Sequence, residues 1–471
     1  MLFNSLSFIV FLLLVLALYY LKIFNWTSKK RMLLIASYVF YGLWNPPLVI
    51  LLWISTVVDW TAGNKLAVEE NSRKRKLWLL LSLFVNLGFL AFFKYGNFLL
   101  DNFTVAIHAI GINFEPQPMD IILPMGISFY TFQTMSYTID MYHKKIKPAR
   151  TFLDFALYVT FFPQLVAGPI VRAQDLISQF YEEKKATVNQ FIWGVFLLTI
   201  GLFQKVVLAD TLLADTSDTV FGSKEILHGL DAWTGTLAFS GQIFFDFAGY
   251  STCAIGIALM LGINLPDNFR YPYASIGFSD LWKRWHISLS SWLRDYLYIP
   301  LGGNKNGITR MYAALMITML LGGLWHGAAW TFVIWGALHG LYLIIERLLR
   351  TRIHIKINSF NGVLLAILTY TLVNFTWVFF RAREFSTAKN MINSMFFMNT
   401  DGIKILQSFE IIKVFILISL LFICHWFMRN TSMKTVSQKI SPILLGIVWA
   451  MMLFLIAISQ GSGEQFIYFQ F

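Results

Sequence analysis

Stretches of about 20 apolar residues recur along this chain, and short loops between them carry most of the charge. A helix of about 20 residues crosses the hydrocarbon core of a bilayer, where only helices and closed barrels satisfy their backbone hydrogen bonds. The pattern therefore predicts an all-α, polytopic integral membrane protein with roughly 11 transmembrane helices. Of the 471 residues, 57% are hydrophobic and 13% are charged, against about 45 to 50% and about 25% in soluble domains. This composition excludes a water-soluble enzyme.

We expect the chain to form a single membrane-embedded domain. Its parts are N-terminal helices in 1–118, a core in about 120–350 and C-terminal helices in 360–471.

Both ends of the chain read as transmembrane helices. Leu2–Leu21 lacks the basic n-region and the cleavage site of a signal peptide, so we interpret it as the first span. The last span is expected at about Ile443–Ile458. Between them, 120–170 is interrupted by prolines and glycines, which membrane helices tolerate where the backbone is buried in protein or lines a wet cavity. These interruptions indicate a functional interior.

Basic residues outnumber acidic residues by 37 to 25, a net charge of +12, and they lie in loops. The positive-inside rule places such loops in the cytoplasm, so membrane topology explains the charge and no nucleic-acid partner is expected. The segments predicted to be cytoplasmic are Lys22–Arg31, Lys65–Lys76, His143–Arg150, Lys283–Arg310, Arg350–Lys356 and Arg429–Lys439. Both termini, and the turn at Asn45-Pro46-Pro47, then lie outside. The segment 381–409 breaks the rule, because an outer loop there would hold Arg381 and three further cations.

Several common catalytic motifs are absent. The chain has no GxSxG, GxxxxGK[ST] or HExxH motif, and Cys253 and Cys424 both lie inside apolar stretches. We therefore expect no metal site, and a histidine-centred reaction remains.

Residues 278–297 project as one amphipathic helix. Trp285 lies on an aromatic arc, while Lys283, Arg284 and Arg294 lie on the opposite side. We expect this helix to lie in the cytoplasmic interface, with its basic face contacting either anionic lipid or a phosphate-bearing ligand. His286, at the edge of the arc, is either a packing residue or a catalyst.

His326 stands in the apolar stretch Leu321–Trp330, flanked by glycine and alanine where helices pack closely. An ionisable group at that depth is costly and is therefore a functional candidate; the alternative is a neutral histidine bonded to a neighbouring helix. His339 is a weaker candidate of the same kind.

A polar stripe runs along the apolar stretch that follows Ser240. Gln242, Asp246 and Tyr250 are spaced by four residues and share one helix face, with Ser251 beside them. A buried carboxylate needs a partner, and a histidine or arginine lining a tunnel would serve. The stripe could equally join packed helices.

At these residues the sequence resembles the membrane-bound O-acyltransferase family, and most closely its branch of bacterial alginate O-acetyltransferases. The matching stretches follow one another through nearly the whole chain. They are PMGISFYTFQTMSYTIDMY (124–142), FFPQLVAGPIVR (161–172), FDFAGYSTCAIGIALMLGINLPDNFRYPY (245–273), WKRWHISLSSWLRDYLYIPLGGN (282–304), GGLWHGAAWTFVIWGALHG (322–340), WVFFRA (377–382) and FIYFQF (466–471).

The resemblance implies a site. The family's essential histidine, in its WHG motif, corresponds to His326, and a second, in RWHISLS, corresponds to His286. It also implies helices around a narrow tunnel in the inner membrane, with acetyl-CoA as the donor substrate and no bound cofactor. The residues expected to bind the donor or line the tunnel are Lys283, Arg284, Arg294, Trp285, Trp325, Asp246, Gln242 and Tyr250.

On the other face, the resemblance implies a polysaccharide or cell-wall acceptor and a secreted SGNH-type acyltransferase partner. Relatives commonly carry FDFSGYSD, whereas this chain has Ala248 and Thr252 in place of the serine and the aspartate. That difference bears on the acceptor or the partner more than on the chemistry.

The chemistry expected of the histidines follows from these positions. His326 would act as general base on the acceptor hydroxyl or as a transient acyl carrier, and His286 or a backbone N–H would stabilise the oxyanion. The alternatives are a conduit that serves a separate transferase, a transporter or flippase, and a transferase of D-alanine from a carrier protein to teichoic acid.

Overall fold

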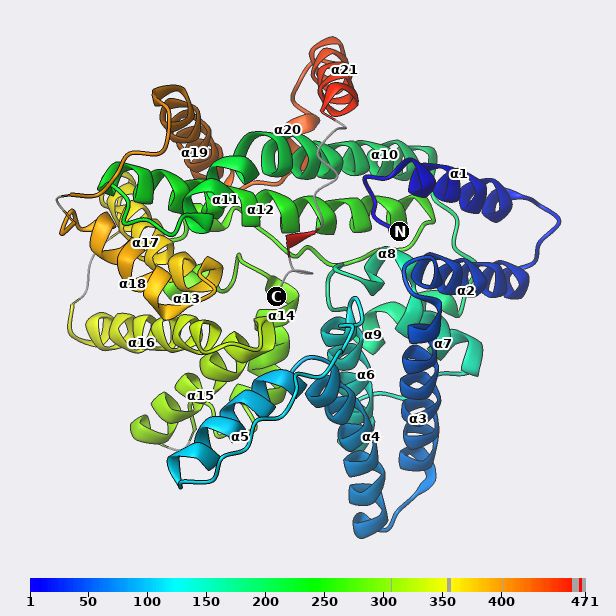
Figure 1. Cartoon of the computed structure of the whole chain (residues 1–471). Helices are drawn as coiled ribbons and strands as arrows, with labels where there is room; N and C mark the ends of the chain where they lie inside the picture. Colours follow the sequence, from blue (N-terminus) through cyan, green and yellow to red (C-terminus); the bar gives the residue numbers. More distant parts are fainter. Residues whose placement is uncertain (306, 354–356, 400, 460–465, 468–471) are drawn as a thin grey trace. The chain divides into compact units, whose positions relative to one another are not determined.

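The computed structural model describes residues 1–305, 307–353, 357–399, 401–459 and 466–467. Over these residues the secondary structure is helical, apart from one isolated bridge between Leu227 and Ile403 (Figure 1). The predicted all-α class is confirmed.

Within the described residues, eight helical segments are long and apolar enough to cross a membrane: Pro46–Val68, Ser72–Phe93, Val188–Gly222, Gly229–Met260, Ile308–His326, Trp330–Arg352, Ser359–Arg381 and Ser408–Met428. Two shorter apolar helices, Leu6–Tyr20 and Pro442–Ile458, lie where the first and last spans are expected. The protein is thus a multi-pass membrane protein, and the count of about 11 crossings stays a prediction.

The chain divides into two compact units. Unit 1 comprises Met1–Leu198 and Cys253–Pro266, and unit 2 comprises Thr199–Thr252 and Asp267–Phe471. The chain first passes from unit 1 to unit 2 after Leu198. The helices that begin before this point are α1 (Leu6–Tyr20), α2 (Trp26–Gly42), η1 (Pro46–Leu48), α3 (Val49–Val68), α4 (Ser72–Phe93), α5 (Gly96–Ala109), α6 (Ile127–Tyr142), α7 (Phe152–Thr160), α8 (Phe162–Leu165), α9 (Ala173–Leu176), η2 (Ile177–Phe180) and α10 (Val188–Leu202).

The helices that follow are η3 (Phe203–Ala214), α11 (Asp215–Gly222), α12 (Gly229–Met260), η4 (Pro272–Ala274), α13 (Phe278–Leu281), α14 (Ile287–Leu293), η5 (Arg294–Tyr298), α15 (Ile308–His326), α16 (Trp330–Arg352), α17 (Ser359–Arg381), α18 (Phe385–Met395), α19 (Ser408–Met428), α20 (Met433–Ser437) and α21 (Pro442–Ile458).

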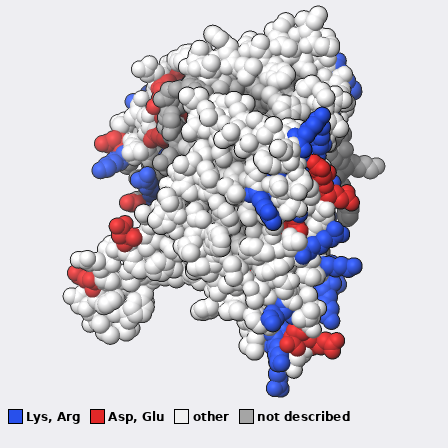
Figure 2. Space-filling view, turned by 90° about the vertical axis from the view of Figure 1, so that its right-hand side faces the viewer, with Lys and Arg blue, Asp and Glu red and all other residues white. Residues whose placement is uncertain are grey.

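Within unit 1, basic residues tie together loops that are predicted to share one side of the membrane. The guanidinium of Arg75 donates to the carbonyl oxygens of Glu69 (3.1 Å) and Tyr142 (2.6 Å), which follow α3 and end α6. Lys29 of α2 pairs with Glu183 at 2.6 Å. Figure 2 shows a broad surface without charged side chains, with most of the charged atoms gathered along its edges. This distribution is that of a protein surrounded by lipid.

Within unit 2, α15 and α16 form a tight helical hairpin. Gly323 of α15 and Gly336 of α16 face each other so closely that an added Cβ would overlap the opposite backbone, that of Phe332 and of Met319 respectively. Small residues allow this approach in membrane helices. The short link Gly327–Ala329 therefore holds the end of α15 close to the start of α16.

The prediction of one continuous helix over 278–297 was wrong. The segment forms α13, α14 and the π-helical η5, and His286 interrupts it with φ 42° and ψ 56°. This left-handed conformation is costly for a residue with a Cβ, and it stops the helix. The main-chain carbonyl of Asn268 accepts a hydrogen bond from Ile287 N at 2.9 Å and stabilises the break. Helical periodicity cannot detect such a tertiary contact.

The segment 381–409, which breaks the positive-inside rule, makes polar contacts with other helices of unit 2. Arg381, at the end of α17, pairs with Asp218 of α11 at 2.6 Å, so its charge is compensated by a neighbouring helix. The segment also contributes Ile405 N, which donates to Asp231 at 2.6 Å. The positive-inside rule counts cations and not net charge, so Arg381 remains an exception to it, and the predicted topology stays a prediction.

Candidate active site

Unit 2 brings the two predicted catalytic histidines together. The imidazole centroids of His286 and His326 lie 6.5 Å apart, and the residues are 0% and 3% exposed. His326 is the last residue of α15, and His286 immediately precedes α14. The sequence predicted that His286 lies on a helix in the membrane interface. In the structure His286 is instead buried within unit 2.

Aromatic rings surround both histidines. Trp325 lies 5.9 Å from His286 and 5.0 Å from His326 between ring centroids. Trp335 of α16 lies 5.0 Å from His326, and Phe247 of α12 lies 4.6 Å from His286. These rings exclude bulk water, and a dry environment strengthens electrostatic interactions with a reacting group.

Asn268 is a polar partner of His286. Its Oδ1 lies 3.1 Å from His286 Nδ1, and its Nδ2 donates to Ser251 Oγ at 3.0 Å. Burial lowers the pKa of His286 from its ordinary value of 6.5 to about 3, so the imidazole is neutral near pH 7. Sequence reasoning missed Asn268. The only available signal was a polar residue, in LPDNFRYPY, close to two predicted site residues.

Asp246 of the α12 stripe has a cationic partner, although not the predicted type. Its Oδ1 lies 2.7 Å from Lys205 Nζ of η3, which also contacts Asp210 at 2.8 Å. The other carboxylate oxygen accepts from Ile467 N at 2.6 Å. The expectation of a histidine or arginine was wrong, because a lysine from a π-helical turn takes this place. Lys205 could have been found as a lone cation inside an apolar span.

The rest of the stripe lies near this cluster. The ring of Tyr250 lies 5.1 Å from that of Phe466, in the FIYFQF motif, whose residues 468–471 lie outside the described residues. Gln242 is 7% exposed, and its Oε1 has no hydrogen-bond partner among the described residues.

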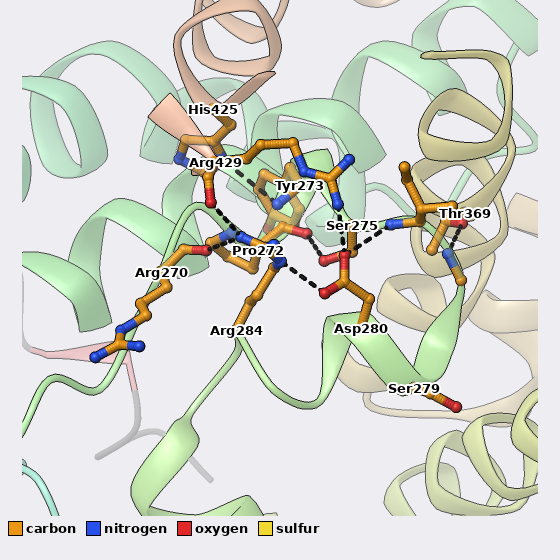
Figure 3. A network of polar contacts seen from close by, with 12 residues as sticks. Arg270, Pro272, Tyr273, Ser275, Ser279, Asp280, Arg284, Thr369, His425 and Arg429 are labelled. Atoms are coloured by element: carbon orange, nitrogen blue, oxygen red, sulfur yellow. Dashed lines mark hydrogen bonds and ion pairs between the residues drawn. The ribbon is translucent and has the colours of Figure 1, made fainter. Parts of the chain in front are cut away.

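The three predicted basic residues do not form one face. Arg284 donates Nε to Asp280 at 2.9 Å and Nη1 to the carbonyl oxygen of Arg429 at 2.9 Å, while Arg429 donates to Asp280 at 3.0 Å (Figure 3). Arg294 in η5 pairs with Asp295 at 2.7 Å and is exposed, as is Lys283. The guanidinium of Arg284 thus joins α13 to the end of α19. Trp285 is buried, with its ring 5.1 Å from that of Trp377.

Buried polar atoms without partners gather on α16 and α17. The indole N–H groups of Trp335 and Trp377 have no acceptor among the described residues, and both side chains are nearly fully buried. His339 Nε2 lies 3.1 Å from Thr376 Oγ1. Because the Thr376 hydroxyl donates its proton to the carbonyl oxygen of Val373 at 2.7 Å, it accepts a hydrogen bond from His339 Nε2. In a neutral imidazole Nδ1 is then the acceptor atom. Nδ1 likewise has no partner in the described chain. Such groups cost about 1 to 3 kcal/mol each unless water or a ligand satisfies them.

The arrangement supplies neutral imidazoles and hydrogen-bond donors in a dry interior. Among the described residues no three metal-ligating side chains come together. This combination can deprotonate a hydroxyl and stabilise the oxyanion of an acyl transfer.

Comparison with known sequences places the chain among acyltransferases. A family model described as "MBOAT, membrane-bound O-acyltransferase family" matches residues 149–356. "Probable alginate O-acetylase AlgI" of Pseudomonas syringae pv. tomato is 43% identical over 84% of this chain and 75% of its own length. "Peptidoglycan O-acetyltransferase" of Helicobacter pylori is 37% identical, with 79% and 74% covered. "Teichoic acid D-alanyltransferase" of Streptococcus thermophilus is 30% identical, with 53% and 63% covered.

Proposed function

Because the chain belongs to the membrane-bound O-acyltransferase family and is an acyltransferase, we propose that it acetylates an extracytoplasmic polymer. The donor is cytosolic acetyl-CoA, and the acceptor is a hydroxyl of a polysaccharide or cell-wall polymer. The relatives named as O-acetylating enzymes are 37 to 43% identical over most of the chain, whereas the D-alanyltransferase match covers about half of it. This difference favours acetyl over D-alanyl transfer.

The observation that carries the proposal is the buried pair of imidazoles, His286 and His326, with ring centroids 6.5 Å apart. Acyl transfer from a thioester needs a base for the acceptor hydroxyl and hydrogen-bond donors for the carbonyl oxygen. The two imidazoles can divide these tasks. The indole N–H of Trp335, beside His326, is a further donor suited to the oxyanion.

On the donor side, Lys283 and Arg294 are the candidates for the phosphates of coenzyme A. Both are exposed, whereas Arg284 is already engaged with Asp280 and with backbone carbonyl groups. Arg294 also pairs with Asp295, but this pair is exposed and therefore weak, so its guanidinium can turn to a phosphate group.

The proposal places the protein in the cytoplasmic membrane, with its N-terminus outside. The loops joined by Arg75 in unit 1 and by Asp280 in unit 2 would face the cytoplasm, in agreement with the positive-inside rule. A secreted SGNH-type transferase would receive the acetyl group wherever direct transfer to the polymer does not occur.

The test is vectorial transfer in proteoliposomes. Labelled acetyl-CoA is supplied on the side of the basic loops, and alginate or peptidoglycan fragments are supplied on the other side, with and without a secreted partner. With the wild-type protein we expect the label to appear in an O-acetyl ester of one of the acceptors. With His326→Ala we expect no labelled ester. Transfer from an acyl carrier protein but not from acetyl-CoA would refute acetyl-CoA as the donor, and solute passage without ester formation would favour a transporter.

A further inference from the structure

We propose that Arg284 and Arg429 form a binding site for the phosphate group of an anionic phospholipid. The inference goes beyond the proposed function, because it concerns neither the acyl donor, nor the acceptor, nor the two histidines. It follows from the balance of charge around Asp280, from the position of Arg429 at the end of an apolar helix, and from the exposed apolar side chains on neighbouring helix ends.

The guanidinium groups of Arg284 and Arg429 converge on a single carboxylate. Arg284 Nε lies 2.9 Å from Asp280 Oδ1, and Arg429 Nη2 lies 3.0 Å from Asp280 Oδ2. Figure 3 shows both side chains pointing towards Asp280. Arg284 Nη1 also donates to the carbonyl oxygen of Arg429 at 2.9 Å, which keeps the two residues together. Two positive charges and one negative charge leave this group with a net charge of 2 − 1 = +1.

The carboxylates next to this group have cations of their own. Glu346 of α16 pairs with Arg350 at 2.7 Å, and Asp267 pairs with Arg270 at 3.3 Å. Figure 3 shows the side chain of Arg270 pointing away from Asp280. These two acidic residues therefore do not compensate the excess positive charge, and an anion from outside the chain would be attracted to it.

The guanidinium of Arg429 has an N–H group without a partner. Its Nε is buried and has no hydrogen-bond partner among the described residues, although 16% of the side chain is exposed. Burial lowers the pKa of Arg429 from its ordinary value, and repulsion by Arg284 acts in the same direction. Arginine binds phosphate through pairs of N–H groups. A phosphate at Arg429 would use Nε and reduce the repulsion between the two guanidinium groups.

Arg429 lies at the depth where lipid headgroups are expected. It directly follows Met428, the last residue of α19, which is long and apolar enough to cross a membrane. The residue after such a helix leaves the hydrocarbon core and enters the headgroup region. The guanidinium of Arg429 lies 5.3 Å from the ring centroid of Trp426, and tryptophan is enriched at the same depth.

Apolar side chains beside the arginine pair suit the acyl chains of a lipid. A Cβ added to Gly362, near the start of α17, would lie 3.3 Å from the ring of Trp426, so the start of α17 and the end of α19 pack together. The exposed apolar residues on these two helix ends are spaced by four and share a face on each helix: Phe360 and Leu364 of α17, and Ile423 and Phe427 of α19. Basic sites between membrane helices bind anionic headgroups, and the apolar flank favours a lipid over a soluble phosphate.

Lipid binding by the whole protein tests the inference. Phosphatidylglycerol or phosphatidylcholine is titrated into the protein in detergent, and bound lipid is counted by native mass spectrometry. We expect wild type to retain phosphatidylglycerol more tightly than phosphatidylcholine, which also has a phosphate but no net charge. Arg429→Gln should weaken the binding of phosphatidylglycerol by about five-fold, the contribution of one cation near an anionic headgroup. Equal retention of the two lipids by wild type would contradict the inference.

Asp280→Asn separates lipid binding from the structural role of the ion pairs. The amide oxygen can still accept from Ile276 N, which donates to Asp280 at 3.0 Å, but the negative charge is lost. Asp280→Asn should therefore bind phosphatidylglycerol at least as tightly as wild type. If the ion pairs only hold the helices together, Asp280→Asn and Arg429→Gln should both lose lipid, and that result would overturn the inference. The result for Asp280→Asn decides if Arg429→Gln fails to fold.

The matched control is Arg381→Gln, at the other end of α17. The Arg381 side chain is 13% exposed, close to the 16% of Arg429, and it pairs with Asp218 at 2.6 Å. One cation and one carboxylate balance there, so Arg381→Gln should leave the binding of phosphatidylglycerol unchanged. Wild-type binding by Arg429→Gln, or an equal loss in Arg381→Gln, would overturn the inference. Displacement of the lipid from wild type by an equal concentration of coenzyme A would assign the arginine pair to a soluble phosphate instead.

Discussion

Two polar clusters lie buried within apolar helices, one in each compact unit, and they differ in whether their polar atoms find partners within the protein. In unit 1, Asp59 of α3 accepts from Asn86 Nδ2 at 2.8 Å, from Thr138 Oγ1 at 3.0 Å and from the hydroxyl of Ser82. The amide oxygen of Asn86 in turn accepts from Ser55 at 2.7 Å. These donors come from α4, α6 and α3, so the network joins three helices.

In unit 2, the cluster around the histidines is incomplete. Trp335, Trp377 and His339 all present buried polar atoms that have no partner among the described residues. A complete network costs little and makes a packing unique, whereas an incomplete one has to be satisfied by water or a bound molecule. The comparison assigns the Asp59 cluster to structure and the histidine cluster to chemistry.

The largest effect is expected from breaking the complete network. Asp59→Leu leaves three donors without their acceptor, at about 1 to 3 kcal/mol each, so stability should fall by about 3 kcal/mol or more. Transfer by the molecules that remain folded should be unchanged. Thermal unfolding in nanodiscs, with turnover normalised to folded protein, measures both. A stable but inactive variant would place Asp59 in the chemistry.

A matched pair of tryptophans separates the two kinds of group within unit 2. Trp335→Phe removes an indole N–H without a partner in the described residues and should lower kcat by about 10²-fold at unchanged Tm. Trp233→Phe removes a hydrogen bond of 2.8 Å to Met395 O and should cost about 1 kcal/mol of stability at unchanged kcat. Equal effects of the two substitutions on kcat would contradict the assignment of Trp335 to the oxyanion.

The burial of His286 predicts a dependence of stability on pH. Its pKa is about 3 in the folded protein and about 6.5 when unfolded, so the unfolded chain binds more protons between these values. The free energy of unfolding should therefore fall by up to about 1.4 kcal/mol per pH unit as the pH drops from about 6.5 towards 3. Tm measured from pH 4 to 7 should show a smaller slope for His286→Gln than for wild type. Identical slopes would mean that this histidine is already protonated or exposed.

The smallest effect is expected from the exposed cations. Lys283→Glu and Arg294→Glu should each raise the apparent KM for acetyl-CoA by a few-fold at unchanged kcat, since exposed ion pairs contribute about 0.2 to 1 kcal/mol. Lys404→Glu, in the 381–409 segment, is the matched charge reversal and should leave KM as it is. An unchanged KM in the first two variants would assign those cations to anionic lipid.

The sequence predicted the features that depend on local pattern. The length of the apolar stretches predicted a helical membrane protein. The turn predicted at Pro46-Pro47 forms η1 between α2 and α3. The glycines around His326 indicated close helix packing, which Gly323 and Gly336 provide. His326 was a candidate because an ionisable group stands out in apolar sequence, whereas His286 was singled out by the resemblance, and the catalytic role of both stays a prediction.

What the sequence could not predict depends on contacts between distant segments. The helix over 278–297 was broken by Asn268, a residue 18 positions before His286, and nothing in the helical projection points to it. Asp246 was expected to need a partner, and Lys205 stands out as a lone cation in apolar sequence, but only the structure shows that these two residues pair. Arg284 was predicted to bind the donor substrate, but in the structure its guanidinium donates to Asp280 and to the carbonyl oxygen of Arg429.

Release of free coenzyme A from acetyl-CoA by the purified protein in nanodiscs tests the central claim most directly. Wild type, His326→Ala and His286→Ala would be compared at matched folded concentration, with an acceptor polymer present. The account predicts release by wild type and a loss of at least about 10²-fold in each variant, because each removes a group in contact with the reacting atoms. Release at the wild-type rate by either well-folded variant would contradict the placing of the reaction between these two histidines.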